Sequence, residues 1–240
     1  KLHDMKRILA ILTTAVMLTG STVYAGNPDR RGEAGAYELL MNGWGRSSGF
    51  WSMNTAGIRG IESERINVAG LAFVKKTEIA AAYTLWLQGS GVGVAHVGIA
   101  QNFKETNVIG LSVQALNLGS IERTTTQNPE GGVGTYKPTF LNIGVSYSKL
   151  FSNSISGGIT LRLINESLGN LNAFGFAVDA GLQYVTGPKD NIHFGVSLRN
   201  VGTPMKFKGD ALANSVQVIS STTYQLTVEN KPNKFELPTQ

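Results

Sequence analysis

The feature that most constrains this chain is a strict alternation of apolar and small polar residues. It runs twice between Phe140 and Asn165, with a Ser/Asn turn between the two runs. In the first run Leu141, Ile143, Val145 and Tyr147 share one face, and Asn142, Gly144, Ser146 and Ser148 share the other. Successive side chains of a strand point to opposite faces, so this period predicts strands with one face in an apolar medium. That medium is either the core of a soluble sandwich or the lipid around a barrel.

The same alternation predicts a series of strands along most of the chain. They are expected at Val68 to Val74, Glu78 to Leu87, Val92 to Phe103, Val108 to Leu118, Phe140 to Lys149, Ile155 to Asn165, Phe174 to Thr186, Ile192 to Val201 and Thr222 to Val228. Most have about 9 to 12 residues, the length that a tilted strand needs to cross a membrane. Strands of globular proteins are more often about 5 or 6 residues long.

The predicted connections alternate between short and long, which favours the barrel. The short connections are Lys75 to Thr77, Lys104 to Asn107, Leu150 to Ser154, Gly187 to Asn191 and Glu229 to Lys234. The long ones are Gly119 to Thr139, Glu166 to Ala173 and Gly202 to Ser221. Only Gln88 to Gly91, which is short where a long connection is expected, departs from the alternation. Outer-membrane barrels have short turns on one side and long loops on the other. The second strand face also suits a crowded interior, because it is mostly Gly, Ser and Ala, and only 15% of the chain is charged. The predicted fold class is therefore all-β, a transmembrane outer-membrane β-barrel.

The N-terminus has the pattern of a secretory signal peptide. After Met5 come a basic pair and the apolar run Ile8 to Leu18, and Val23-Tyr24-Ala25 precedes Gly26. This predicts cleavage between Ala25 and Gly26, with the residues before Met5 read as upstream sequence. Removing residues 1–25 takes away three basic residues and one acidic one, so the net charge falls from +5 to +3. So mild a charge does not predict nucleic-acid binding.

The mature chain is expected to have two parts. Residues 26–67 are rich in glycine, arginine and tryptophan and predict a plug or hatch inside the barrel; the alternative is a leader with one irregular strand. Residues 68–240 predict an incomplete barrel of about 9 or 10 strands, because Phe235 to Gln240 resembles the start of another strand. Strand edges in lipid leave unpaired backbone groups, so we expect a truncated sequence and an open, curled sheet.

Several segments carry a resemblance to a known family. They are Gly32 to Leu40, Arg46 to Gly49, Gly60 to Glu62 and Asn67 to Ala72 near the N-terminus, and Ala173 to Gly181, Tyr184 to Pro188 and Leu198 to Met205 further on. Residues 26–240 thereby resemble the PorV/PorQ family, relatives of the FadL-type outer-membrane transporters. The plug motif departs from the family pattern Trp-Asn-Pro-Ala-Gly-Leu: here Asn67, Ala69, Gly70 and Leu71 match, but Val68 replaces the proline. This leaves a backbone N-H at Val68 and predicts a softer corner.

The resemblance implies a fold, a location and partners. Proteins of this family are 14-stranded barrels in the outer membrane of Bacteroidetes and act in the type IX protein secretion system. They bind a large translocon barrel and secreted cargo that carries a C-terminal sorting signal, and they escort this cargo to the surface attachment machinery. The expected partners are therefore outer-membrane lipid, the translocon and the cargo, with no cofactor. A FadL-like channel for hydrophobic small molecules is the alternative, and a lipid A deacylase is a weaker one.

Few residues suggest chemistry. His96 and His193 have no metal-ligand spacing, no Ser/His/Asp group can be assembled, and there is no cysteine, so neither an enzyme nor a metal site is predicted. Arg162, Asp179 and Arg199 fall on the polar faces of neighbouring strands and predict a ladder inside the barrel, because a charge on the lipid side is unfavourable.

The long loops are the predicted contact with a protein partner. Met205, Phe207 and Leu212 lie in the last of these loops and are candidate apolar anchors, although an ordinary solvated loop would also fit.

Overall fold

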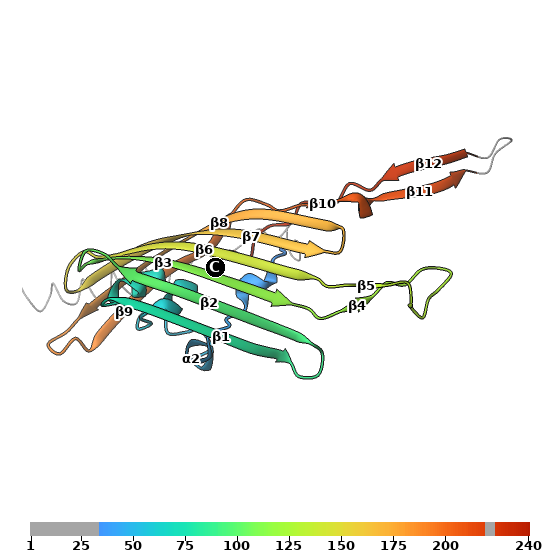
Figure 1. Cartoon of the computed structure of the whole chain (residues 1–240). Coiled ribbons are helices and arrows are strands. Elements are labelled where there is room, and N and C mark those ends of the chain that lie inside the picture. The colour runs from blue at the N-terminus through green and yellow to red at the C-terminus, as the bar shows by residue number, and fades with distance from the viewer. Residues whose placement is uncertain (1–33, 219–223) are drawn as a thin grey trace, which may run out of the picture. The chain divides into compact units, whose positions relative to one another are not determined.

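The computed structural model describes residues 34–218 and 224–240. These residues form a mostly antiparallel β structure, which confirms the all-β prediction (Figure 1). The long strands are β1 (Thr77–Leu87), β2 (Val92–Asn102), β3 (Asn107–Asn117), β6 (Thr139–Leu150), β7 (Ile155–Leu168), β8 (Leu171–Thr186) and β9 (Ile192–Gly202). No helix within the described residues has both the length and the apolar character needed to cross a membrane. Residues 1–33, with the predicted Ala25–Gly26 cleavage site, lie outside the described part.

Each long strand pairs with the next one in an antiparallel ladder. The order is β1-β2-β3-β6-β7-β8, with β9 on the remaining edge of β8 and the short β10 (Phe207–Lys208) further along that edge. Among the described residues β1 and β9 are not hydrogen-bonded to each other, so the sheet is open, as predicted. Two smaller hairpins, β4 with β5 (Ile121–Glu122, Thr135–Tyr136) and β11 with β12 (Ala213–Val218, Tyr224–Glu229), are separate from it. In Figure 1 the β4–β5 hairpin extends beyond the ends of the long strands.

The prediction of a strand from Val68 to Val74 is wrong. This segment is the 3-10 helix η4 (Val68–Phe73), which follows the short helical turns η2 (Tyr37–Leu40), α2 (Gly45–Gly49) and η3 (Ile61–Arg65). Residues from Val68 to Ala72 are all buried, although a strand with one covered face would bury every second residue. The irregular segment that we expected to end at residue 67 therefore continues to the start of β1. We call residues 34–74 the N-terminal segment.

The predicted long loops need two corrections. Residues 166–173 are not a long loop, because β7 and β8 extend until only Gly169 and Asn170 separate them, with Gly169 at a φ of 60°. Polar residues such as Ser167 and Asn172 continue the ladder beyond the apolar stretch, so alternation of hydrophobicity did not reveal them. The loops at 119–139 and 202–221 contain the short strands β4, β5, β10 and β11. Of the last predicted strand, Thr222 to Val228, residues 224–228 lie in β12 and the first two lie outside the described part.

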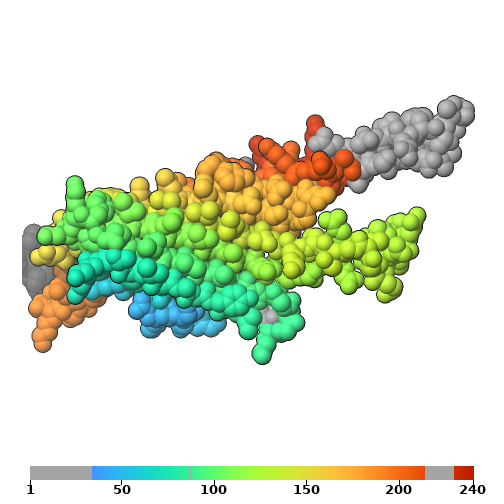
Figure 2. All heavy atoms as spheres, in the orientation of Figure 1, coloured from blue at the N-terminus to red at the C-terminus, as the bar shows by residue number. Residues whose placement is uncertain are grey.

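The polar face of the sheet is buried and its apolar face is exposed, which is the reverse of the usual arrangement in soluble proteins. The small and polar residues are buried, because the N-terminal segment packs on their face, which we call the inner face. On the opposite, outer face one cross-strand row is exposed and apolar in all seven long strands: Ile79, Ile99, Leu111, Val145, Leu161, Val178 and Val201. The strands cover most of the N-terminal segment in Figure 2, where its residues appear beside β1. The core therefore lies between the N-terminal segment and the polar side of the sheet, in two small clusters around Leu71 and Ile164.

Candidate functional site

The glycines of the inner face are sockets for side chains of the N-terminal segment. A Cβ on Gly98 would lie 2.6 Å from Ile61, and one on Gly110 would lie 2.9 Å from Leu71. At Gly144 it would lie 2.1 Å from the Glu64 carboxylate, and at Gly181 it would lie 2.0 Å from Asn67 Oδ1. Real Cβ atoms do not approach other atoms so closely, so these positions accept only glycine in this arrangement. In the alternating pattern the apolar residues thus form the outer face, and the glycines leave room on the inner face for side chains of the N-terminal segment.

Asn67 fixes the corner at which the N-terminal segment turns onto the sheet. Its Oδ1 accepts a hydrogen bond from the Ala69 backbone at 3.1 Å, which caps helix η4. Its Nδ2 donates to the carbonyl oxygens of Thr55 at 3.0 Å and of Leu182, in β8, at 3.1 Å. This side chain therefore organises the corner, and Leu71 adds its side chain to the core beneath.

Gly70 provides a direct test of how closely this corner packs. A Cβ there would lie 2.1 Å from the backbone oxygen of Ile58, which cannot move as a side chain can. We expect Gly70→Ala to lower the free energy of unfolding by about 1 to 3 kcal/mol, the usual range for overpacking. Urea titration of the folded chain in detergent micelles measures this change.

Gly57→Ala is the matched control, because nothing lies within 4 Å of a Cβ at Gly57. We expect that variant to unfold within about 0.5 kcal/mol of the parent, as surface substitutions usually do. Equal effects of the two substitutions would contradict the close approach at Gly70.

Two of the three residues of the predicted ladder form a buried ion pair. Arg162 Nη2 in β7 lies 2.7 Å from Asp179 Oδ2 in β8, and both side chains are buried. The second carboxylate oxygen of Asp179 accepts a hydrogen bond from the Asn200 backbone at 2.6 Å, at the point where β9 shifts its register against β8. The pair therefore joins three neighbouring strands on the inner face.

Arg199, the third residue of the ladder, bonds elsewhere. Its Nη1 donates to the backbone oxygen of Arg65 at 3.2 Å, and its Nη2 bonds to Gln240. Arg65 is itself buried, and its guanidinium donates to the carbonyl oxygens of Glu38 at 2.7 Å and Met41 at 3.0 Å. Burial lowers the pKa of Arg65 to about 9, with a further contribution from Arg162. These contacts connect β9 to the N-terminal segment through a chain of guanidinium–carbonyl bonds.

Glu64 attaches the N-terminal segment to the middle of the sheet. Its carboxylate accepts a hydrogen bond from Ser112 Oγ at 2.5 Å and lies in the socket over Gly144. Burial raises the pKa of Glu64, while Arg162 and then Ser112 oppose that rise. Glu64 was not predicted as a site residue, because a charged residue in a Ser/Glu-rich stretch usually indicates an exposed turn.

The residues predicted as anchors of a partner loop are not exposed together. Met205 is fully buried, because its side chain fills the space over Gly175, where a Cβ would lie 2.5 Å from Met205 Cγ. Phe207 is half-buried and packs on Phe235, with ring centroids 5.5 Å apart. Only Leu212, in the 3-10 helix η5 (Asp210–Leu212), lies away from that core cluster. The prediction that Met205 is an accessible anchor is therefore wrong.

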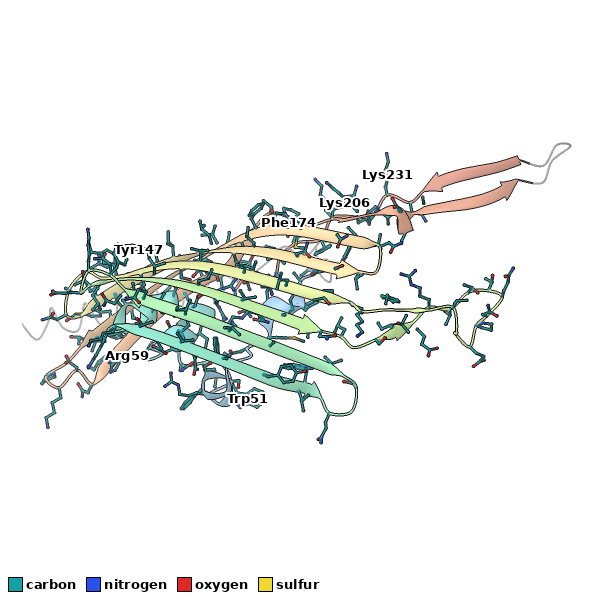
Figure 3. The ribbon with its side chains drawn as sticks, viewed as in Figure 1. Trp51, Arg59, Tyr147, Phe174, Lys206 and Lys231 are labelled. Atoms are coloured by element: carbon teal, nitrogen blue, oxygen red, sulfur yellow. The ribbon has the colours of Figure 1, made fainter. Side chains whose placement is uncertain are left out.

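A cavity of about 550 Å³ opens beside the N-terminal segment. Its walls include Trp51, Met53 and Trp86, and Arg65 and Arg199 also line it. Trp51 is 85% exposed at a φ of 53° (Figure 3), a conformation that non-glycine residues adopt rarely. An apolar wall beside two guanidinium groups suits an amphipathic molecule with an anionic end.

The two histidines among the described residues lie on different strands. His96 is buried in β2 with its ring stacked on Trp44 at 4.3 Å, and His193 lies near the start of β9. No group of three or more His, Asp or Glu side chains in the described part is arranged to hold a metal ion.

No protein-family model matches the chain, and no curated protein matches it.

Proposed function

We propose that this chain forms the wall and plug of an outer-membrane β-barrel and acts as a non-enzymatic component of type IX protein secretion. In this role it binds the translocon barrel, secreted cargo or both. The single observation that carries the membrane part of the proposal is the exposed apolar outer face of the sheet. The secretory part rests on the family resemblance of residues 26–240.

The outer face has the chemistry that lipid requires. The exposed row from Ile79 to Val201 is unbroken across seven strands, whereas soluble monomers rarely expose large contiguous apolar patches. Lys149 is the one charged residue on this face of the long strands, and it lies next to a short turn. Contact of this apolar face with water is unfavourable, whereas contact with lipid would stabilise it.

Aromatic side chains lie towards both ends of the apolar band. Near the short turns the exposed ones are Phe103, Tyr147, Phe151, Tyr184 and Phe194, and towards the other end they are Tyr83, Phe174 and Phe176. Figure 3 labels one residue of each group, Tyr147 and Phe174. Membrane barrels carry such girdles of aromatic residues at both interfaces with water. This arrangement supports the proposed position of the strands in the membrane.

The filled inner face favours docking over transport. The N-terminal segment enters glycine sockets on β2, β3, β6 and β8 and bonds to the sheet through Asn67, Glu64 and Arg199. A solute could pass along this face only if these contacts separated. A role in which exposed loops hold a partner does not require that separation.

One observation favours a second function, the passage of hydrophobic small molecules. The cavity lined by Trp51, Met53 and Trp86 lies beside the plug and has two guanidinium groups. A Trp51→Ala/Trp86→Ala double variant would lower the uptake of an anionic amphiphile such as a fatty acid under this second function. It would leave cargo secretion intact under the first.

The proposed function predicts where the chain is found and what it binds. We expect the mature chain to fractionate with outer membranes, to need detergent for extraction and to co-purify with a large barrel protein and with cargo carrying the sorting signal. A deletion strain should retain that cargo inside the cell and should keep unchanged lipid A. A monodisperse, detergent-free chain would contradict the membrane part, and normal secretion in the deletion strain would contradict the secretory part.

A further inference from the structure

A group of four buried polar side chains lies between the N-terminal segment and the sheet. Glu38 comes from η2, Gln114 from β3, Asn142 from β6 and Glu166 from β7. Gln114 and Asn142 are direct partners across the β3–β6 ladder. The β7 partner of Asn142 is Ile164, and Glu166 follows Ile164 by two residues on the same face. Long side chains at such diagonal positions of a ladder can reach each other. Each of the four side chains belongs to a residue that is at most 5% exposed.

Most of the terminal oxygen atoms in this group have no hydrogen-bond partner within the described residues. This is true of both carboxylate oxygens of Glu38, of Glu166 Oε1, of Asn142 Oδ1 and of Gln114 Oε1. Asn142 lies beside the Glu38 carboxylate, and its Nδ2 is also without a partner; the Glu38 carboxylate interacts electrostatically with that of Glu166. A buried polar atom without a partner is unfavourable, and a buried charge without one is more so. The amide group of Asn142 has only two N-H donors for five oxygens, so a further positive group is needed among them.

The nearby arginines do not supply it. Arg65 interacts electrostatically with Glu38, but its guanidinium bonds are to the carbonyl oxygens of Glu38 and Met41. Arg162 is paired with Asp179. Among the described residues the fully buried carboxylates are Glu38, Glu64, Glu166 and Asp179, and the fully buried guanidinium groups are those of Arg65 and Arg162. The buried carboxylates thus outnumber the buried guanidinium groups.

We propose that Glu38, Gln114, Asn142 and Glu166 bind a hard cation of the calcium class and so tie the N-terminal segment to strands β3, β6 and β7. Carboxylate and amide oxygens are the ligands that Ca²⁺ prefers, and its flexible coordination tolerates an irregular set completed by water. The five oxygens without partners provide most of the usual six to eight ligands. The site depends on the packing of the plug and is independent of the secretory role.

The test uses the full folded chain in detergent micelles after treatment with a chelator. A ligand that binds only the folded state raises the midpoint of thermal unfolding as its concentration increases. We expect CaCl₂ to raise this midpoint by several degrees, and KCl at the same ionic strength to leave it unchanged. Glu38→Gln and Glu166→Gln should each abolish the calcium-dependent rise. Glu64→Gln is the matched control, because it makes the same change at a buried carboxyl group outside the site and should keep that rise.

Asn142→Asp tests the proposal in the opposite direction. It adds a third carboxylate, and calcium affinity in such sites increases with ligand charge, so we expect the Kd for Ca²⁺ to fall about tenfold. This variant decides the matter even if Glu38→Gln fails to fold. No calcium effect on the parent, together with destabilisation by Asn142→Asp at all calcium concentrations, would overturn the proposal.

A proton, in place of a cation, could neutralise the same carboxyl groups. The dependence of stability on pH distinguishes protonation from cation binding. Burial raises the pKa of Glu38, so the folded chain binds that proton more tightly than the unfolded chain does. Stability due to protonation would then increase as the pH falls towards the raised pKa. An unfolding midpoint that rises on acidification and is indifferent to calcium would show that a proton occupies the site and would overturn the cation proposal.

Discussion

Asp179→Leu is expected to lower the free energy of unfolding by about 3 to 5 kcal/mol, because it leaves Arg162 buried without its carboxylate. Asp179 accepts hydrogen bonds from Arg162 Nη2 and from the Asn200 backbone, so one substitution removes two bonds that join β7, β8 and β9. Urea titration in detergent micelles, followed by tryptophan fluorescence, measures the loss.

The control for this prediction is a double-mutant cycle. Asp179→Leu/Arg162→Leu removes both charges, and we expect it to recover most of the stability, because the uncompensated guanidinium is gone. The backbone N-H of Asn200 stays without its acceptor in both variants, so a residual loss of about 1 kcal/mol is expected. A double variant as unstable as Asp179→Leu alone would show that the ion pair is not the source of the effect.

Leu161→Arg is expected to destabilise the chain in lipid by about 2 to 4 kcal/mol. Leu161 is in the middle of β7 and of the exposed apolar row, where its neighbours are Val145 and Val178. An arginine near the midplane of a bilayer has this effect on a membrane barrel, and in water the same exposed change would be nearly neutral. Folding equilibria in phospholipid vesicles, measured by urea titration, give the value.

Ile121→Arg is the matched control for Leu161→Arg. Ile121 is also an exposed apolar strand residue, but it lies in the β4–β5 hairpin, apart from the main sheet. We expect the control to change the unfolding free energy by less than about 0.5 kcal/mol. Equal effects at the two positions, or a neutral Leu161→Arg, would mean that the outer face does not lie in hydrocarbon.

Prediction from the sequence succeeded where one local rule decided the structure. The seven long strands follow from the alternation of apolar with small or polar residues, since a strand places neighbours on opposite faces whatever surrounds it. The rule failed at Val68 to Val74. Residues Val68 to Ala72 of that segment are all buried, so its apolar residues carry no period and a 3-10 helix was indistinguishable from a short strand.

Contacts between distant parts of the chain were not predictable. Met205 looked like an apolar loop residue until Gly175, thirty positions earlier, proved to leave room for its side chain. The sequence did not indicate the partners of Glu64 and Arg65, because the sheet provides Ser112 and the N-terminal segment provides the carbonyl oxygens of Glu38 and Met41. The carboxyl–amide group around Asn142 is likewise invisible in the sequence, because its members come from four separate elements.

The amino-acid order specifies the strands and the small size of the residues on their inner faces, since both are local properties of a pleated backbone. Which face is covered, which glycine receives which side chain, and which charges meet depend on how the N-terminal segment folds back on the sheet. The physical reason is that burial and pairing energies arise between residues far apart in the chain, and only the packed structure brings those residues within contact distance.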